Sequence, residues 1–210
     1  MEPTQDGHAR RQAAKRAEIL AAATEVFFDE GYARASMDRV LAKVGGSKRT
    51  LYNYFPSKED LFAAIVTNVS DRVLAALRPR LDAGDIRETL VAMGIGYLNV
   101  LLSPEGLALY RAMVSEAPHF PDLARTFFDN GPGRASRHLA GFFQELKEKG
   151  LLAAEDPERA AQQFLGMVQG EVHLVAVLSI RKPTKAQVRK TVEQAVETFL
   201  CGAAPDLCRS

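Results

Sequence analysis

The sequence has little cysteine, no tryptophan and no long apolar run. Its two cysteines, Cys201 and Cys208, stand within the last ten of 210 residues. Neither their number nor their spacing fits a disulfide framework or a zinc site, so we expect both thiols to be reduced and incidental. The start of the chain has no apolar signal-peptide core, and no window approaches about eighteen uninterrupted apolar residues. These absences favour a cytoplasmic protein with no membrane partner.

The chain also lacks β-type alternation, internal repeats and low-complexity stretches. Apolar residues instead recur at helical spacing, as in Ile19, Leu20, Ala23, Val26 and Phe27, which share one face of an amphipathic helix. Glycine and proline mark the breaks, for example at Gly84. The pattern predicts an all-α fold with long helices over Arg11–Glu30, Lys58–Leu77, Ile86–Leu102, Glu105–Glu116, Pro121–Glu148, Pro157–Ile180 and Thr184–Leu200.

The formal net charge of +1 hides an uneven distribution of charge. Between His8 and Lys58 there are ten lysines and arginines against five acidic residues, whereas from Leu61 to the end there are seventeen residues of each sign. Basic side chains that contact phosphates release counterions and supply most of the non-specific affinity for nucleic acid. The positive first quarter therefore suits a polyanionic partner.

Two short helices are predicted between Ser36 and Tyr54. Ser36 and Ser47 are each placed to cap a helix, and the glycines of Val44-Gly45-Gly46 separate the two helices. The outer side of the second helix combines cations, hydroxyls and an amide, which bond phosphates and base edges. The segment predicts a helix-turn-helix whose second helix enters the major groove.

This region resembles the N-terminal signature of the TetR/AcrR regulators. The resemblance runs from about Glu18 to Leu61 and is carried by Gly31-Tyr32, Val40–Phe55 and Ser57–Leu61. Two positions depart from the family pattern: glycine replaces the usual valine of the turn, and Val40-Leu41 replaces Ile-Ala. The stretch from Tyr110 to Gly150 is similar to the C-terminal domain of the AefR-like branch.

The resemblance implies a three-helix DNA-binding domain over residues 1–57 and a larger helical ligand-binding and dimerisation domain over 58–210. In the first domain it implies base contacts from Lys48 and Arg49 and phosphate contacts from Ser36 and Lys58. The full set of expected DNA-binding residues is Ser36, Ser47, Lys48, Arg49, Thr50, Tyr52, Asn53, Tyr54 and Lys58.

Several of these side chains have a plainer interpretation. Tyr52 fits a half-buried packing aromatic and Lys58 a solvated surface lysine. A further basic cluster at the start of the chain fits either an arm that reaches flanking phosphates or a disordered, solvated start; its members are Arg10, Arg11, Lys15 and Arg16.

In the second domain, methionines, aromatics and a few polar groups suit an adaptable apolar cavity for a small, partly apolar ligand. The candidate ligand-binding residues are Met93, Tyr97, Tyr110, Met113, Phe127, Phe128, Phe142, Met167, Glu171 and His173. Apolar stripes on the last two predicted helices suggest a dimer interface formed by Phe164, Val168, Val175, Val188, Val192, Val196 and Phe199. For both sets, packing in the core of one chain is the alternative.

No metal site or cofactor is expected, because Glu171 and His173 are two residues apart and share no helix face. The resemblance implies a homodimeric repressor that binds a palindromic operator, with the ligand lowering DNA affinity; activation stays open. A helical hydrolase or transferase is a second interpretation, but the chain has no nucleophile elbow or phosphate-binding glycine loop, so we expect no enzyme. An architectural DNA-binding protein is a third, which the neutral second domain argues against.

Overall fold

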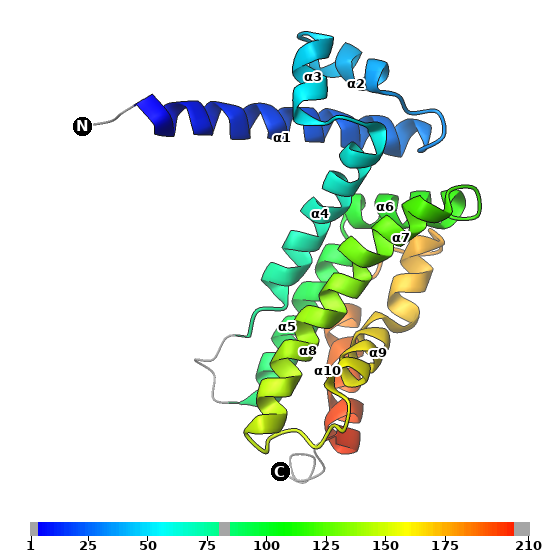
Figure 1. Cartoon of the computed structure of the whole chain (residues 1–210). Coiled ribbons are helices and arrows are strands. Elements are labelled where there is room, and N and C mark those ends of the chain that lie inside the picture. The colour runs from blue at the N-terminus through cyan, green and yellow to red at the C-terminus, as the bar shows by residue number, and fades with distance from the viewer. Residues whose placement is uncertain (1–3, 80–84, 204–210) are drawn as a thin grey trace. The chain divides into compact units, whose positions relative to one another are not determined.

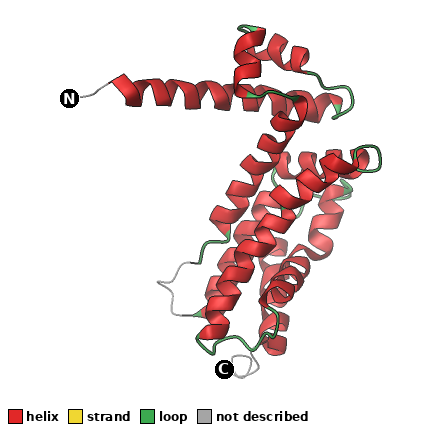
Figure 2. Ribbon diagram, viewed as in Figure 1, coloured by secondary structure: helices red, strands yellow, loops and turns green. Residues whose placement is uncertain are grey.

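The computed structural model describes residues 4–79 and 85–203, and all regular structure in these ranges is helical (Figures 1 and 2). This confirms the all-α prediction. The helices are α1 Thr4–Glu30, α2 Met37–Val44, α3 Lys48–Tyr54, α4 Lys58–Ala76, α5 Ile86–Leu101, α6 Pro104–Glu116, α7 Pro121–Asn130, α8 Pro132–Glu148, α9 Pro157–Val177 and α10 Lys185–Ala203. The break expected at Gly84 and the thiol expected at Cys208 lie outside the described residues.

The single helix predicted over Pro121–Glu148 is wrong, because the chain breaks at Gly131 between α7 and α8. Pro132 supplies the physical reason: its ring disfavours the helical conformation in the residue before it, and Gly131 has φ −111° and ψ −102°. Helix α9 ends three residues before its predicted end and is kinked at Gly170, which has φ 45° and ψ −155°. Both the break and the kink occur at a glycine.

The chain divides into two compact units. One comprises Met1–Asn68 with Ala112–Phe127, and the other comprises Val69–Arg111 with Phe128–Ser210. Helices α4, α6 and α7 therefore each pass from one unit to the other. The functional division at residue 57 stays a prediction.

The core of the second unit is formed mainly by α5, α8, α9 and α10. Phe143, Phe164 and Phe199 pack together there, with ring centroids 5.1–5.9 Å apart. Helix α5 approaches α10 so closely at Gly94 that an added Cβ would lie 2.6 Å from a methyl group of Val192. Glycine is therefore required at this crossing.

The residues predicted for the dimer interface need correction. Each is at most 8% exposed within the single chain, so none can face a partner. The stripes they form on α9 and α10 are the inner faces of those helices, and the interior packing alternative holds for all of them. They are Phe164, Val168, Val175, Val188, Val192, Val196 and Phe199.

The described part of the chain bears on two expectations, one about membrane-spanning helices and one about the cysteine thiols. No single helix there is long and apolar enough to cross a membrane; α5 and α6 meet that criterion only as a pair bent by 65°, and by length and composition alone. The expectation of a reduced thiol is wrong for Cys201, which is disulfide-bonded.

Candidate nucleic-acid interface and sensing region

The turn between α2 and α3 is built from local backbone signals. Helix α2 begins after Ser36, whose Oγ accepts a hydrogen bond from the Arg39 N–H at 3.3 Å. It ends at Gly45, whose N–H donates to the Leu41 carbonyl at 2.8 Å. Gly45 and Gly46 have φ of 71° and 91°, values that side chains with a Cβ rarely adopt. Gly46 is therefore required by the turn in this chain, in the place where the family usually has valine.

Helix α3 is held by a cap and an inner face. The Oγ of Ser47 accepts from the Thr50 N–H at 3.1 Å and lies 2.8 Å from the Thr50 hydroxyl. Leu51 and Phe55 are 1% and 2% exposed and fix the helix inward. The opposite side is thereby turned to solvent: Ser47, Lys48, Arg49, Tyr52 and Asn53 are exposed, while Thr50 and Tyr54 are half-buried.

The two cations on α3 have different surroundings. Lys48 Nζ lies 2.9 Å from Asp38 Oδ1 on α2, and this hydrogen bond raises the pKa of Lys48. The same ammonium stands 5.9 Å from the centre of the Tyr52 ring. Arg49 is exposed and carries no ion pair within the described part of the chain. Arg49 is therefore the α3 cation that can bind an external group without first breaking an internal contact.

Lys58 is more constrained than a solvated lysine. Its ammonium lies 4.1 Å from the centre of the Tyr32 ring and donates to the Ala33 carbonyl at 3.4 Å. Partial burial lowers the pKa of Lys58. Tyr32 in turn donates from its hydroxyl to Glu59 at 3.0 Å, and burial raises the pKa of Tyr32. The lysine thus joins the start of α4 to the segment before α2, and its phosphate contact stays a prediction.

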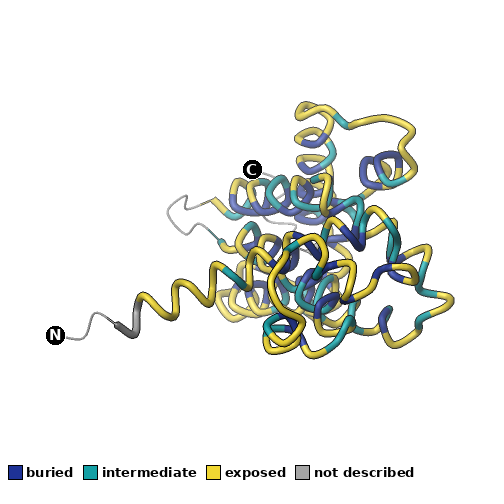
Figure 3. The backbone as a smooth tube through the Cα atoms, turned by 90° about the horizontal axis from the view of Figure 1, so that it is seen from above, coloured by how far each residue is buried: buried dark blue, intermediate teal, exposed yellow. Residues whose placement is uncertain are grey.

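The basic start of the chain is helical from Thr4 onward, so the disordered alternative does not hold there. Residues 7–14 of α1 are exposed (Figure 3). The Arg16 guanidinium stands 4.9 Å from the centre of the Phe55 ring. A groove of about 670 Å³ between α1 and α3 is lined by Gln12, Arg16, Thr50, Asn53 and Tyr54 among others. Arg16 and the outer side of α3 therefore border one groove.

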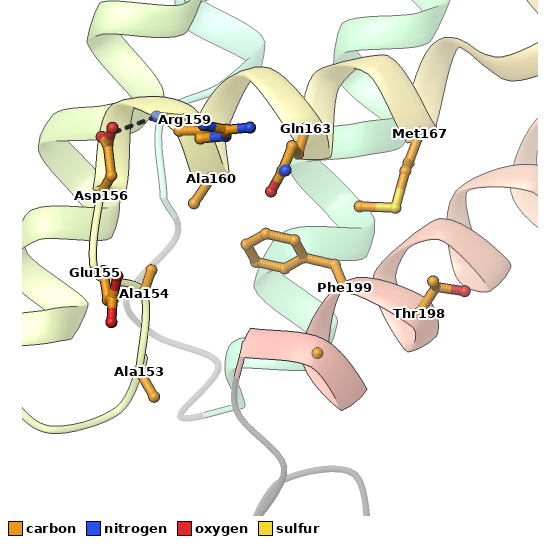
Figure 4. A pocket seen from close by; sticks show the side chains of 11 residues that line it. Ala153, Ala154, Glu155, Asp156, Arg159, Ala160, Gln163, Met167, Thr198 and Phe199 are labelled. Atoms are coloured by element: carbon orange, nitrogen blue, oxygen red, sulfur yellow. Dashed lines mark hydrogen bonds between the residues drawn. The ribbon is translucent and has the colours of Figure 1, made fainter.

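The predicted ligand-binding residues are not all gathered in one place. Met93, Tyr97, Phe142 and His173 are buried in the second unit, where Tyr110 is 36% exposed. Met167 is half-buried and lines, with Phe199, a hollow of about 580 Å³ between α9 and α10 (Figure 4). Phe128 and Glu171 are exposed, and Met113 and Phe127 belong to the first unit.

A small polar set nevertheless lies within this apolar region. Gln169 donates to the Tyr97 hydroxyl at 2.7 Å, and the rings of Tyr110 and His173 meet edge to face with centroids 4.9 Å apart. Gln169 and His173 lie on α9 on either side of its kink at Gly170. Sequence reasoning missed Gln169, because its partner Tyr97 lies on another helix and is 72 residues away in the sequence.

His173 stands out because its Nε2 is buried without a hydrogen-bond partner among the described residues. Burial lowers the pKa of His173, which favours the neutral imidazole. A buried nitrogen without a partner is unusual, since most buried polar atoms are hydrogen-bonded to protein or water. We refer to these two pairs, Tyr97–Gln169 and Tyr110–His173, as the sensing cluster.

Comparison with known proteins identifies the family. Residues 19–65 match the family described as bacterial regulatory proteins of the tetR family, and residues 88–202 match the AefR-like transcriptional repressor C-terminal domain. This chain belongs to the TetR family. The resemblance seen in the sequence, including its AefR-like branch, is confirmed.

Two solved structures of similar proteins span nearly the whole TetR-family chain. A solved structure of the flavonoid-responsive regulator FrrA is 34% identical with a TM-score of 0.78, and covers 92% of this chain and 98% of its own. A TetR-family regulator from Mesorhizobium loti is 30% identical with a TM-score of 0.79 over the same shares. The uncharacterized regulator YezE of Bacillus subtilis is 30% identical over 151 residues, 68% of this chain and 75% of YezE.

The buried histidine predicts an acid dependence of stability in this TetR-family regulator. Because burial holds the pKa of His173 below its ordinary value of about 6.5, the unfolded chain binds the proton more tightly. The stabilising effect of the neutral ring is complete above about pH 6.5 and falls as the pH drops toward the folded-state pKa, by at most about 1.4 kcal/mol per pH unit.

Urea unfolding of wild type and His173→Gln between pH 5 and 8 measures this effect. We expect the free energy of unfolding to fall less steeply with acid in the variant. His138→Gln is the matched control, because His138 is exposed. Equal acid slopes for wild type and His173→Gln would contradict the prediction.

Proposed function

We propose that this TetR-family regulator is a ligand-responsive repressor that binds a palindromic operator as a dimer. The observation that supports it most directly is the outer side of α3, where Arg49 stands exposed in the first turn of a helix capped by Ser47. Phosphate contacts fix the position of such a helix, and base contacts give specificity. The protein acts in the cytoplasm, has no enzymatic role, and contacts DNA through Ser36, Ser47, Lys48, Arg49, Thr50, Tyr52, Asn53, Tyr54 and Lys58.

The dimer forms through the exposed face of α9. Leu174, after the kink at Gly170, and Leu178, the C-cap residue of α9, are four residues apart, and both are exposed. The two leucines are 55% and 59% exposed, which is unusual for large apolar residues on one helix face. The two leucines supply apolar area for a second helix. Two-fold pairing gives the dimer two copies of α3, one for each half-site of a palindromic operator.

Helix α6 carries the signal from ligand to DNA. Its middle bears Tyr110, which contacts His173 in the second unit. Its last residue, Glu116, accepts a hydrogen bond from the Ala33 N–H at 3.4 Å in the first unit, in the segment that precedes α2. A ligand that binds the sensing cluster better in one position of α6 than in another therefore shifts the equilibrium between two states of that segment.

The ligand is a small, partly aromatic molecule with a hydroxyl group. The sensing cluster supports this class, since aromatic rings contribute apolar surface and the neutral His173 Nε2 has no partner among the described residues. The similarity to FrrA, described as flavonoid-responsive, points the same way. The flavanone naringenin is a suitable first probe.

Fluorescence anisotropy on labelled DNA from upstream of the regulator's own gene tests ligand response. We expect naringenin to release wild-type protein and to act at least about tenfold less effectively on His173→Ala, which loses one hydrogen bond in a buried site. His119→Ala, an exposed histidine, is the control. Unchanged DNA affinity at saturating naringenin would reject this ligand class, and equal response of both variants would reject the role of His173.

Removing the charge of Lys58 is expected to change how DNA affinity depends on salt concentration. Replacing it with methionine keeps most of the apolar stem beside Tyr32 and removes the charge. If the lysine contacts a phosphate, the slope of log affinity against log salt concentration becomes shallower by about 1 per subunit. Anisotropy titrations between 50 and 200 mM salt measure the slope, and an unchanged slope would leave Lys58 with a structural contact only.

A further inference from the structure

A second cavity in the C-terminal unit has a lining of unusual charge. It occupies about 460 Å³ among the end of α5, the start of α6, the end of α9 and the start of α10. This volume lies within the range of about 300–1,000 Å³ of small-molecule sites. Four cationic side chains line it, Arg111, Arg181, Lys182 and Lys185, and no acidic residue does so within the described lining. Cations gathered without acids favour an anionic occupant.

Arg111 is fixed in place by the end of α9. Its Nε donates to the Val177 carbonyl at 2.7 Å, and its Nη2 donates to the Ala176 carbonyl at 2.6 Å and to the Ser179 hydroxyl at 2.9 Å. These three bonds orient the guanidinium, and Nη1 has no acceptor among the described residues. A guanidinium held in one orientation binds a carboxylate with little further loss of conformational freedom.

The other three cations of the cavity differ in whether they form an ion pair with a carboxylate. Arg181 pairs with Glu171 at 3.3 Å, and both side chains are largely exposed. Lys182 and Lys185 make no ion pair within the described part of the chain. The cavity therefore keeps two lysine charges that no internal carboxylate neutralises.

The rest of the lining is largely apolar. Leu102 and Leu107 are half-buried, and Ala176 and Val188 are buried. Burying alkyl carbon against such residues removes apolar surface from water. A lining that combines cationic and apolar side chains complements a molecule that has an anionic head and a short apolar tail.

We propose that this cavity binds a small amphipathic carboxylate. The carboxylate accepts charge-assisted hydrogen bonds from Lys182, Lys185 and the Arg111 guanidinium, and the tail lies against Leu102 and Leu107. The site shares no residue with the sensing cluster, so it goes beyond the proposed function and does not depend on it.

Isothermal titration calorimetry of the full chain without DNA tests the proposal with three probes. Octanoate has both head and tail, octanamide has the tail without the charge, and acetate has the charge without the tail. We expect octanoate to bind at least about tenfold more tightly than either of the others, because each lacks one of the two contributions. Equal binding of octanamide and octanoate, or no octanoate binding at millimolar concentration, would overturn the proposal.

Paired variants locate the binding. Lys182→Gln with Lys185→Gln removes two lysine charges that line the cavity, whereas Lys149→Gln with Lys190→Gln removes two exposed lysine charges that do not line it. We expect the first pair to lose at least about tenfold in octanoate affinity and the second pair to keep it. Thermal unfolding checks that both are folded. Octanoate binding that survives the first pair but is lost in His173→Ala would place it at the sensing cluster and reject this site.

Discussion

Arg49→Ala is expected to lower affinity for the operator by about tenfold to a hundredfold while leaving non-specific DNA binding nearly unchanged. A bidentate contact to a guanine edge contributes about 1–3 kcal/mol of discrimination, whereas a phosphate contact contributes equally to every sequence. Arg49 is the favoured base-reading cation, since Lys48 is already paired with Asp38 across the turn. Anisotropy titrations on operator and scrambled DNA measure both affinities.

Arg78→Ala is the matched control for this prediction. Arg78 is also an exposed arginine but lies beyond the end of α4, in the other unit. We expect it to change both affinities by the same small factor. If Arg49→Ala weakened operator and scrambled DNA equally, Arg49 would contact phosphate and another α3 side chain would read the bases.

Leu174→Glu combined with Leu178→Glu is expected to convert the dimer to monomers and to lower operator affinity by at least about a hundredfold. Facing α9 helices would bring four carboxylates into an apolar contact, where unpaired charges are strongly unfavourable. A monomer carries one recognition helix and cannot hold both half-sites. Sedimentation velocity measures the oligomeric state, and anisotropy measures the affinity.

Leu151→Glu is the control, because Leu151 is 41% exposed and lies outside α9. It introduces a carboxylate at an exposed leucine without touching the proposed face. We expect it to remain dimeric with wild-type operator affinity. A dimer that persists in the α9 double variant would place the interface elsewhere.

The helix-turn-helix was predictable because its signals are local. Ser36 and Ser47 are the caps the sequence predicted, and Leu51 with Phe55 are the buried anchors. Each of these features depends on residues within one helical turn. The ends of α2 and α3 therefore match the sequence prediction closely.

The second unit was predictable in its helices but not in their partners. Apolar spacing on α9 and α10 correctly indicated a buried face, yet Val192 and Phe199 face the core of the same chain and not a second copy. The periodicity of apolar residues indicates that a helix face is buried, but it does not indicate whether the same chain or a second copy buries it. The Tyr110–His173 ring contact and the Arg111 hydrogen bonds to the end of α9 join residues about 65 apart, which no local pattern encodes.

The central claim, specific DNA binding through α3, is tested most directly by a gel shift on the DNA upstream of the regulator's own gene, with excess competitor DNA. The account predicts a discrete, competitor-resistant complex of the size of one or two dimers, which disappears with Arg49→Ala and persists with Arg78→Ala. Binding to that DNA and to an unrelated genomic fragment that competitor abolishes equally, with no difference between the two variants, would contradict it.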